Sequence, residues 1–312
     1  MNAYFDIFSG ISGNMVLGAL VDLGLDLKEW KKELSKLGLS DEYNIKTEKV
    51  AKHGIGGTYL EVELMDSDNN HHEHNNHGDH KHSHDGHEHN HEEHSHESNH
   101  EHNHDHTHHH HHEGDDHHDH KHNHGHSHSH GRNLSDIKEL IDKSKLSTEV
   151  KEKSKEIFLN LAKAEAKIHG KDINKIHFHE VGAVDAIVDI VGSVLGLEML
   201  GIDKIYASKL HTGTGFVNCD HGKMPVPAPA TMELLAGLPV YSEGIEAEMV
   251  TPTGAAIIST LAEKFGPRKE MKINKSGYGA GSWDLPIPNL LRINLIEEDR
   301  DEENINQQKK NQ

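Results

Sequence analysis

Apolar and polar residues follow two different periods in the opening part of the chain, which predicts a strand followed by helices. Residues 3–8 (AYFDIF) form a short apolar run typical of a buried strand. A Gly/Ser turn at 9–14 separates this run from an apolar helix expected over 15–24, and a second helix is expected over 27–37. The chain therefore begins as an α/β unit.

Alternation of period two comes next and predicts a pair of strands. Residues 44–51 and 58–64 alternate apolar and polar side chains, and the sequence HGIGG between them supplies a turn. On the second strand we expect Leu60, Val62 and Leu64 to face inward and the residues between them to face solvent.

Hydrophobic periodicity stops at about residue 66 and resumes at about residue 132. The residues between are mostly His, Asp, Glu, Asn, Gly and Ser, with too few apolar side chains to bury a core. We interpret this stretch as a disordered insertion whose two ends lie close together in the folded core. The entropy cost of a loop grows only logarithmically with its length, so a core tolerates a long one.

Two helices are predicted directly after the insertion. Ser135 is placed to cap a helix over 136–143, and Ser147 begins an amphipathic helix that extends to about residue 169. The remaining chain alternates strand and helix signals, with strands expected at 175–181 and 205–210.

Further apolar helices are expected over 183–200 and over 251–265. Residues 272–296 are expected to form a GYGAG turn followed by a strand. The sequence thus predicts an α/β fold with a mixed sheet flanked by helices.

The predicted domain organisation is discontinuous. Residues 1–66 and 131–296 are expected to form the α/β core, which could divide into two subdomains. Residues 67–130 form the predicted His-rich metal-binding insertion, and residues 297–312 a disordered tail.

Charge and composition exclude several classes of protein. The formal net charge is −20, and no basic stripe is present, so a nucleic-acid partner is not expected. No stretch approaches the ~18 consecutive apolar residues of a membrane span, and the first residues lack the features of a signal peptide. The single Cys219 excludes a disulfide framework, which is typical of a cytoplasmic protein.

The insertion is the clearest candidate for metal chemistry. It holds 29 of the 35 histidines, including five consecutive ones. Neutral imidazole is a good ligand for Zn, Ni, Cu and Co, and carboxylates lie between the histidines. We therefore interpret the tract as a metal reservoir that would release metal on acidification, although a spacer without ligand function is the alternative. The consecutive histidines are His108, His109, His110, His111 and His112.

A second candidate metal site lies around the sequence HFHE. On a strand, His177 and His179 would point to the same side, and Glu180 follows them. Asp185 and Asp189 share a face near the start of the next helix, so imidazoles and carboxylates could converge there on a transition metal. The alternative is an ordinary strand and an acidic helix start.

Two turns are candidates for binding a phosphate group. The turn SGISGN and the sequence TPTG each precede a helix, where free backbone N–H groups favour anions. Thr251 would cap its helix ahead of a proline at the first helical position. A tight turn and a simple cap are the alternatives. The candidate residues are Ser9, Gly10, Ser12, Gly13, Asn14, Thr251, Thr253 and Gly254.

A loop rich in Gly and Pro adds one further candidate ligand. His221 follows Cys219 and Asp220 there, and we expect His221 to ligate metal, whereas Cys219 is typical of a small buried residue.

Five segments resemble those of the nickel insertion protein family of nickel-pincer-nucleotide biosynthesis. They are YFDIFSGISGNM, IHFHEVGAVDAIVDIVG, HGKMPVPAPATMELLAG, EMVTPTGAAI and GYGAG with PNLLR. The resemblance covers most of 1–66 and 131–296, and family members carry a His-rich insertion at the same place. Two positions depart from the family: Asn14 replaces an Asp, which weakens a metal role there, and Ile7 replaces a frequent Cys.

The resemblance implies a CTP-dependent nickel insertase, or cyclometallase. It would form one nickel–carbon and two nickel–sulfur bonds in pyridinium-3,5-bisthiocarboxylic acid mononucleotide. CTP with Mn or Mg is expected to bind a further C-terminal domain, so the chain resembles the N-terminal portion of the enzyme. The partners implied are nickel ions, the nucleotide and such a domain or frameshift product, and a homo-oligomer is expected.

The resemblance and the residue chemistry together suggest roles for the candidates. Glu180 or Asp185 would remove the ring proton, while the metal would be held by His177, His179, Asp189 and His221. The alternatives are a non-catalytic nickel metallochaperone or store and, with less support, a nucleotide hydrolase.

Overall fold

The computed structural model describes residues 1–65, 132–176, 178, 182–219, 222–268 and 270–297. Within these ranges, seven strands form one mixed sheet in the order β2-β3-β10-β11-β1-β4-β9. Strands β1, β4 and β9 are parallel, and β11 is antiparallel to both β1 and β10. The predicted α/β fold with a mixed sheet is confirmed.

Strands of the large sheet, short strands and helices follow one another along the chain. The strands of the large sheet are β1 (Asn2–Asp6), β2 (Tyr43–Lys52), β3 (Ile55–Leu64), β4 (Lys204–Ala207), β9 (Ala262–Phe265), β10 (Lys272–Ala280) and β11 (Leu290–Glu297). The short strands are β5 (Leu210–His211), β6 (Phe216–Cys219), β7 (Gly222–Pro225) and β8 (Val240–Tyr241). The helices are α1 (Gly13–Asp22), α2 (Leu27–Leu34), α3 (Leu134–Lys143), α4 (Thr148–His169), α5 (Val184–Met199), α6 (Pro229–Leu234) and α7 (Pro252–Leu261).

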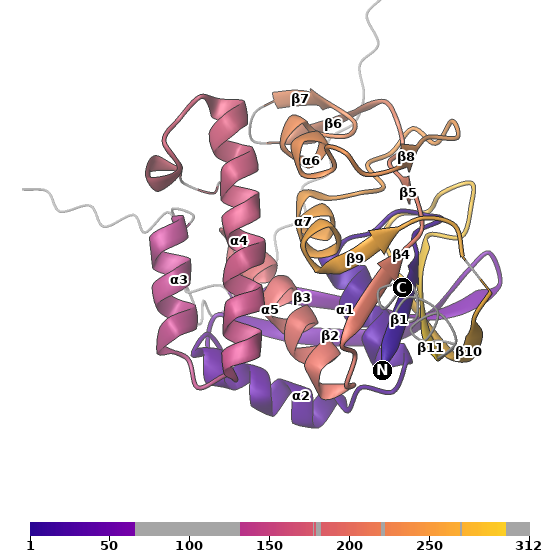
Figure 1. Ribbon diagram of the computed structural model, residues 1–312, viewed down its shortest axis with the longest axis horizontal. Helices are drawn as coiled ribbons and strands as arrows, with labels where there is room; N and C mark the ends of the chain where they lie inside the picture. The colour runs from indigo at the N-terminus through magenta and orange to yellow at the C-terminus, as the bar shows by residue number, and fades with distance from the viewer. Residues whose placement is uncertain (66–131, 177, 179–181, 220–221, 269, 298–312) are drawn as a thin grey trace, which may run out of the picture. The chain divides into compact units, whose positions relative to one another are not determined.

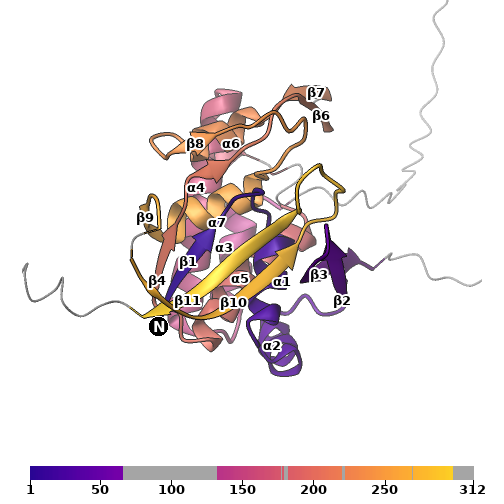
Figure 2. The ribbon, with the colours of Figure 1, turned by 90° about the vertical axis from the view of Figure 1, so that its right-hand side faces the viewer.

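The helices cover one face of the sheet. Figure 1 shows α3, α4 and α5 on one side and the strands β1, β10 and β11 on the other, and α1 packs on β3 and β10. Figure 2, which looks onto the opposite face, shows β10, β11 and β1 in front of the helices. The core lies between the sheet and the helices and includes Phe5, Leu17, Trp30, Phe158 and Ile190, all fully buried.

Glycines let α1 lie directly on the sheet. A Cβ on Gly279 of β10 would be 1.8 Å from the carbonyl oxygen of Met15, and one on Gly277 would be 2.5 Å from that of Ala19. Gly18 of α1 lies similarly close to the backbone of Thr58 on β3. The GYGA sequence is therefore part of a strand, and its prediction as a turn is wrong.

The two ends of the predicted insertion lie close together, as expected. The Met65 N–H donates to the Glu42 carbonyl oxygen at 2.9 Å, and the Arg132 guanidinium binds the Glu42 carboxylate at 2.8 Å. Glu42 thus contacts the chain on both sides of the insertion. Residues 67–130 and 298–312, including the consecutive histidines, lie outside the described residues.

Several element predictions need correction. The helix expected over 251–265 ends at Leu261, and the next residues form β9. Asn133, not Ser135, caps α3, because its side chain accepts from the Asp136 N–H at 3.0 Å. Leu64 is 55% exposed, although the alternation predicts that it faces inward.

The strand expected over 175–181 is also wrong where the chain is described. Lys175 ends a short 3₁₀ helix, and Ile176 and Phe178 are buried but belong to no strand. Strand alternation therefore gives no reason to place His177 and His179 on the same side.

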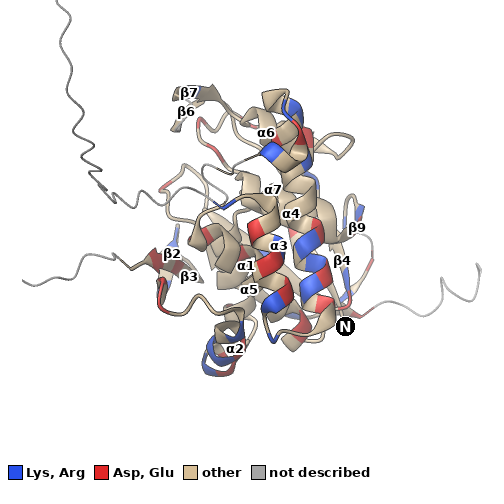
Figure 3. Ribbon diagram, turned by 90° about the vertical axis from the view of Figure 1, so that its left-hand side faces the viewer, with Lys and Arg blue, Asp and Glu red and all other residues tan. Residues whose placement is uncertain are grey.

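The outer helical surface carries both signs of charge. Figure 3 shows basic and acidic residues intermixed along α3 and α4. Several are paired, as in the Lys155–Asp142 ion pair at 2.7 Å. Within the described ranges, no helix has the length and apolar character needed to cross a bilayer.

Candidate functional site

The two turns predicted to bind a phosphate lie side by side. The Ile11 N–H donates to the Met249 carbonyl oxygen at 2.8 Å, and the Thr251 N–H donates to the Ile11 carbonyl oxygen at 3.1 Å. A Cβ on Gly254 would be 2.2 Å from that same oxygen of Ile11. The N-terminal ends of α1 and α7 therefore meet. The candidates brought together here are Ser9, Gly10, Ser12, Gly13, Asn14, Thr251, Thr253 and Gly254.

The hydroxyl groups in these turns have different partners. Thr251 Oγ1 accepts a hydrogen bond from the Gly254 N–H at 3.2 Å, which confirms the predicted cap of α7. Ser12 Oγ instead donates to Asn14 Oδ1 at 2.5 Å and caps no backbone group. Ser9 is buried, and its hydroxyl has no hydrogen-bond partner in the described part of the chain.

A carboxylate from α5 lies at the N-terminal end of α1. Asp189 Oδ2 is 2.3 Å from where a Cβ on Gly13 would be, so glycine is needed for this contact. The backbone N–H of Asn14 donates a hydrogen bond to the Asp189 carboxylate. A negative charge is favourable at a helix N-terminus, so α1 partly stabilises the Asp189 carboxylate.

Asp185 and Asp189 form a coupled pair on one face of α5, one turn apart. Burial, and secondly the negative charge of Asp185, raise the pKa of Asp189 well above its ordinary value, while the bond from Asn14 opposes this. Oδ1 of each carboxyl group is buried without a hydrogen-bond partner among the described residues. Such a pair is suited to accept a proton.

The other predicted metal ligands and the candidate base Glu180 are not among the described residues. His177, His179, Glu180 and His221 lie outside the described residues, as do the five consecutive histidines. Where the chain is described, no three His, Cys, Asp or Glu side chains are grouped to hold a metal.

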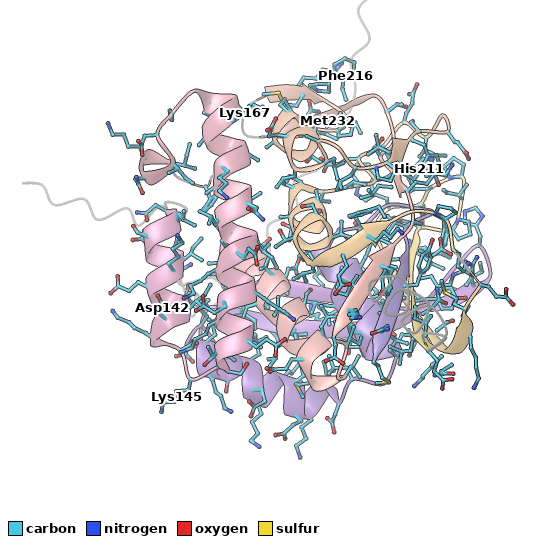
Figure 4. The ribbon with its side chains drawn as sticks, in the orientation of Figure 1. Asp142, Lys145, Lys167, His211, Phe216 and Met232 are labelled. Atoms are coloured by element: carbon cyan, nitrogen blue, oxygen red, sulfur yellow. The ribbon has the colours of Figure 1, made fainter. Side chains whose placement is uncertain are left out.

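His211 is a buried imidazole that the sequence analysis did not assign to the site. It is the last residue of β5, which pairs with β8, and Figure 4 labels its side chain. Its Nε2 accepts a hydrogen bond from the Glu243 N–H at 3.2 Å. Its Nδ1 is buried without a partner in the described ranges. Burial lowers the pKa of His211, so the ring is neutral at neutral pH. A histidine at a strand end before a Gly-rich turn was the available signal.

The chain matches the protein family described as "Nickel insertion protein" over residues 3–311. A relative from Desulfitobacterium hafniense (strain DSM 10664 / DCB-2) is 45% identical over 97% of this chain and 61% of its own length. It is named pyridinium-3,5-bisthiocarboxylic acid mononucleotide nickel insertion protein, as is one from Clostridium kluyveri that is 41% identical over 96% of the chain and 63% of its own length. A putative nickel insertion protein of Maridesulfovibrio salexigens is 49% identical over 94% of the chain and 62% of its own length.

The chain spans about three fifths of the length of these curated relatives. No solved structure matches it.

Proposed function

Because the chain belongs to the nickel insertion protein family, we propose that it takes part in inserting nickel into pyridinium-3,5-bisthiocarboxylic acid mononucleotide. The relatives that carry this name are similar to the chain over almost its whole length. The observation that supports the proposal most directly is the meeting of two helix N-termini with the carboxylates of α5. Such a site places proton acceptors beside two helix N-termini.

The chemistry divides into metal binding and proton removal. The thiocarboxylate sulfurs of the substrate would bind the incoming nickel, which then forms a bond to the ring carbon between them. The C–H bond of that carbon breaks, and its proton passes to a carboxylate. We assign this step to the Asp185–Asp189 pair, with Glu180 as the neighbouring candidate, because the raised pKa of Asp189 favours proton uptake.

Asp189 is therefore better suited to hold a proton than to be a resident metal ligand, since a protonated carboxyl group ligates metal poorly. We keep His177, His179 and His221 as proposed nickel ligands on the chemistry of imidazole. The insertion, with its consecutive histidines, would concentrate nickel near the site.

We further propose that CTP, with Mn or Mg, binds a region of the longer relatives that this chain does not span. No cytidine or triphosphate role is assigned to the described residues.

The test is nickel insertion by the purified chain. The thiocarboxylate mononucleotide, nickel, CTP and Mg or Mn are supplied, and the product is detected by the mass gained with one nickel. The assay is run with and without the remaining part of a longer relative. Product in either arm, lost in Asp185→Asn and Glu180→Gln and kept in the exposed control Asp41→Asn, supports the proposal.

Two results would change it. Product formed equally by Asp185→Asn and Glu180→Gln removes the assignment of the base. No product in either arm, with nickel still bound, indicates a metallochaperone or nickel store instead.

A further inference from the structure

The face of the sheet opposite the helices carries charged and aromatic side chains where β1 ends. On β1, Phe5 is fully buried toward the helices, so Asp6 faces the other side of the sheet. Asp6 pairs in register with Arg292 of β11, and the Arg292 guanidinium binds the Asp6 carboxylate. The Arg292 guanidinium carbon also lies 5.7 Å from the centre of the Phe8 ring.

Two further cations reach this point from the ends of β4 and β9, which run parallel to β1. Arg268 follows β9, and its Nη2 lies 3.8 Å from the Asp6 carboxylate. Lys209 follows β4, and its Nζ lies 3.9 Å from the centre of the Tyr241 ring. The carboxyl ends of parallel strands share one edge of a sheet, which is where α/β proteins bind ligands.

Backbone hydrogen bonds fix these segments against β1. Ser208 Oγ accepts from the Ile7 N–H at 2.9 Å, and the His211 N–H donates to the Ile7 carbonyl oxygen at 3.4 Å, so Lys209 lies beside the end of β1. The negative charge of Asp6 contributes to the raised pKa of Tyr241, after burial and Glu243, so Asp6 and Tyr241 are within electrostatic reach.

The residues of this cluster carry more positive than negative charges. Lys209 and Arg268 are exposed, and Arg292 is half-buried with an Nε that has no partner in the described part of the chain. Asp6 and Glu243 offset two of the three positive charges, so the described residues of the cluster keep a net positive charge. By contrast, the Asp189 side chain already occupies the space at the N-terminal end of α1, where it lies against Gly13 and accepts a hydrogen bond from the Asn14 N–H.

We propose that Lys209, Arg268 and Arg292 bind the phosphate monoester of the pyridinium mononucleotide, beside the rings of Phe8 and Tyr241. The inference rests on the proposed function, because it takes the substrate class from there. The phosphate would therefore bind at the carboxyl edge of the sheet, on the face opposite the helices, and not at the turns 9–14 and 251–254 as the sequence predicts. Guanidinium groups match the oxygens of a phosphate, and a lysine adds a point charge.

Binding of a commercial analogue tests the assignment. Nicotinic acid mononucleotide is a pyridinium mononucleotide, and its riboside differs only in lacking the phosphate. Titration calorimetry on the full chain compares wild type with Lys209→Ala, Arg268→Ala, the double variant of these two, Arg292→Lys and Arg292→Ala. Lys264→Ala, which removes an exposed lysine from β9, is the matched control for net charge.

We expect Lys209→Ala and Arg268→Ala each to weaken mononucleotide binding about tenfold, the double variant more, and neither to change riboside binding. Arg292→Lys should lose less than Arg292→Ala, and Lys264→Ala should bind as wild type does. Both exposed variants should keep the wild-type melting temperature.

Three results would overturn the assignment, and they are distinguishable. Unchanged mononucleotide binding in the double variant removes the phosphate role but leaves the proposed function intact. If the wild-type chain binds CTP, a loss of CTP binding alone in these variants would make the cluster a triphosphate site. Failure of the wild type to bind the mononucleotide at millimolar concentration contradicts the substrate class itself, and with it the proposed function.

Discussion

The buried carboxyl group of Asp189 determines how one part of the stability depends on pH. Its pKa is raised in the folded state, so the folded protein binds this proton more tightly than the unfolded chain does. The contribution of Asp189 to stability is fully present below the unfolded pKa of about 3.9. This contribution is lost as the pH rises from there through the folded pKa. Asp189→Asn removes that loss.

We therefore expect Asp189→Asn to raise the free energy of unfolding by about 1–3 kcal/mol at pH 8 and by little at pH 4. Urea unfolding at both pH values measures the difference. The exposed Asp41→Asn is the control and should show no such pH dependence. An equal effect of Asp189→Asn at both pH values would contradict the coupled pair.

His211 has the opposite dependence. Burial lowers its folded pKa, so as the pH falls below about 6.5 the unfolded state gains a proton that the folded state does not bind. Wild type should lose about 1 kcal/mol more stability than His211→Gln between pH 7.5 and pH 5.5. The two proteins differ at this residue alone, so the difference between their losses of stability isolates His211. Equal losses of unfolding free energy in the two proteins over this pH range would show that burial does not lower the pKa of His211.

At the scale of elements, the contact of α1 with β10 depends on the absence of side chains. A Cβ at Gly279 would meet the Met15 carbonyl oxygen, and backbone cannot rotate away as a side chain can. We expect Gly279→Ala to cost about 3 kcal/mol of unfolding free energy. Gly56→Ala on β3, where a Cβ meets nothing within 4 Å, should be nearly neutral. Equal losses of unfolding free energy in Gly279→Ala and Gly56→Ala would show that the backbone freedom of glycine, and not the contact with α1, determines the cost.

The helices were predictable because their apolar stripes and caps are local signals. Ser147 and Thr251 cap the helices that they are predicted to begin. The glycines of β10 were misleading, because they serve close packing there rather than a turn. The strand β9 was missed because its residues continue an apolar helix pattern, and only pairing with β4 makes it a strand.

The candidate site was predictable in its parts and not in its assembly. The turns at 9–14 and 251–254 stand out separately by their composition, yet their contact is long-range and depends on the sheet order. The cluster of Lys209, Arg268 and Arg292 had no local pattern at all, since three separate strands bring it together.

At the scale of the whole molecule, Glu42 contacts the chain on either side of the insertion, so we expect the core to fold without the tract. Replacing 66–131 with an eight-residue Gly/Ser linker should preserve the fold and raise the free energy of unfolding by about 2 kcal/mol, because a shorter loop costs less entropy. Urea unfolding measures this change. Loss of cooperative unfolding would show that the tract is part of the core.

The same variant tests whether the core catalyses nickel insertion while the tract only supplies nickel. Nickel insertion should persist at saturating nickel and fall when nickel is scarce. A loss of insertion at every nickel concentration would favour the store over the enzyme.

The closure at Glu42 also sets a minimum local concentration of imidazole around the core. With both ends held at one point, no residue of the tract lies farther away than half its contour, about 115 Å, whatever conformation it adopts. The 29 histidines within that radius correspond to at least about 7 mM imidazole. This value does not fall when the protein is diluted. If the tract binds nickel as proposed, a metal ion released by one imidazole would meet many others before it leaves the neighbourhood of the core.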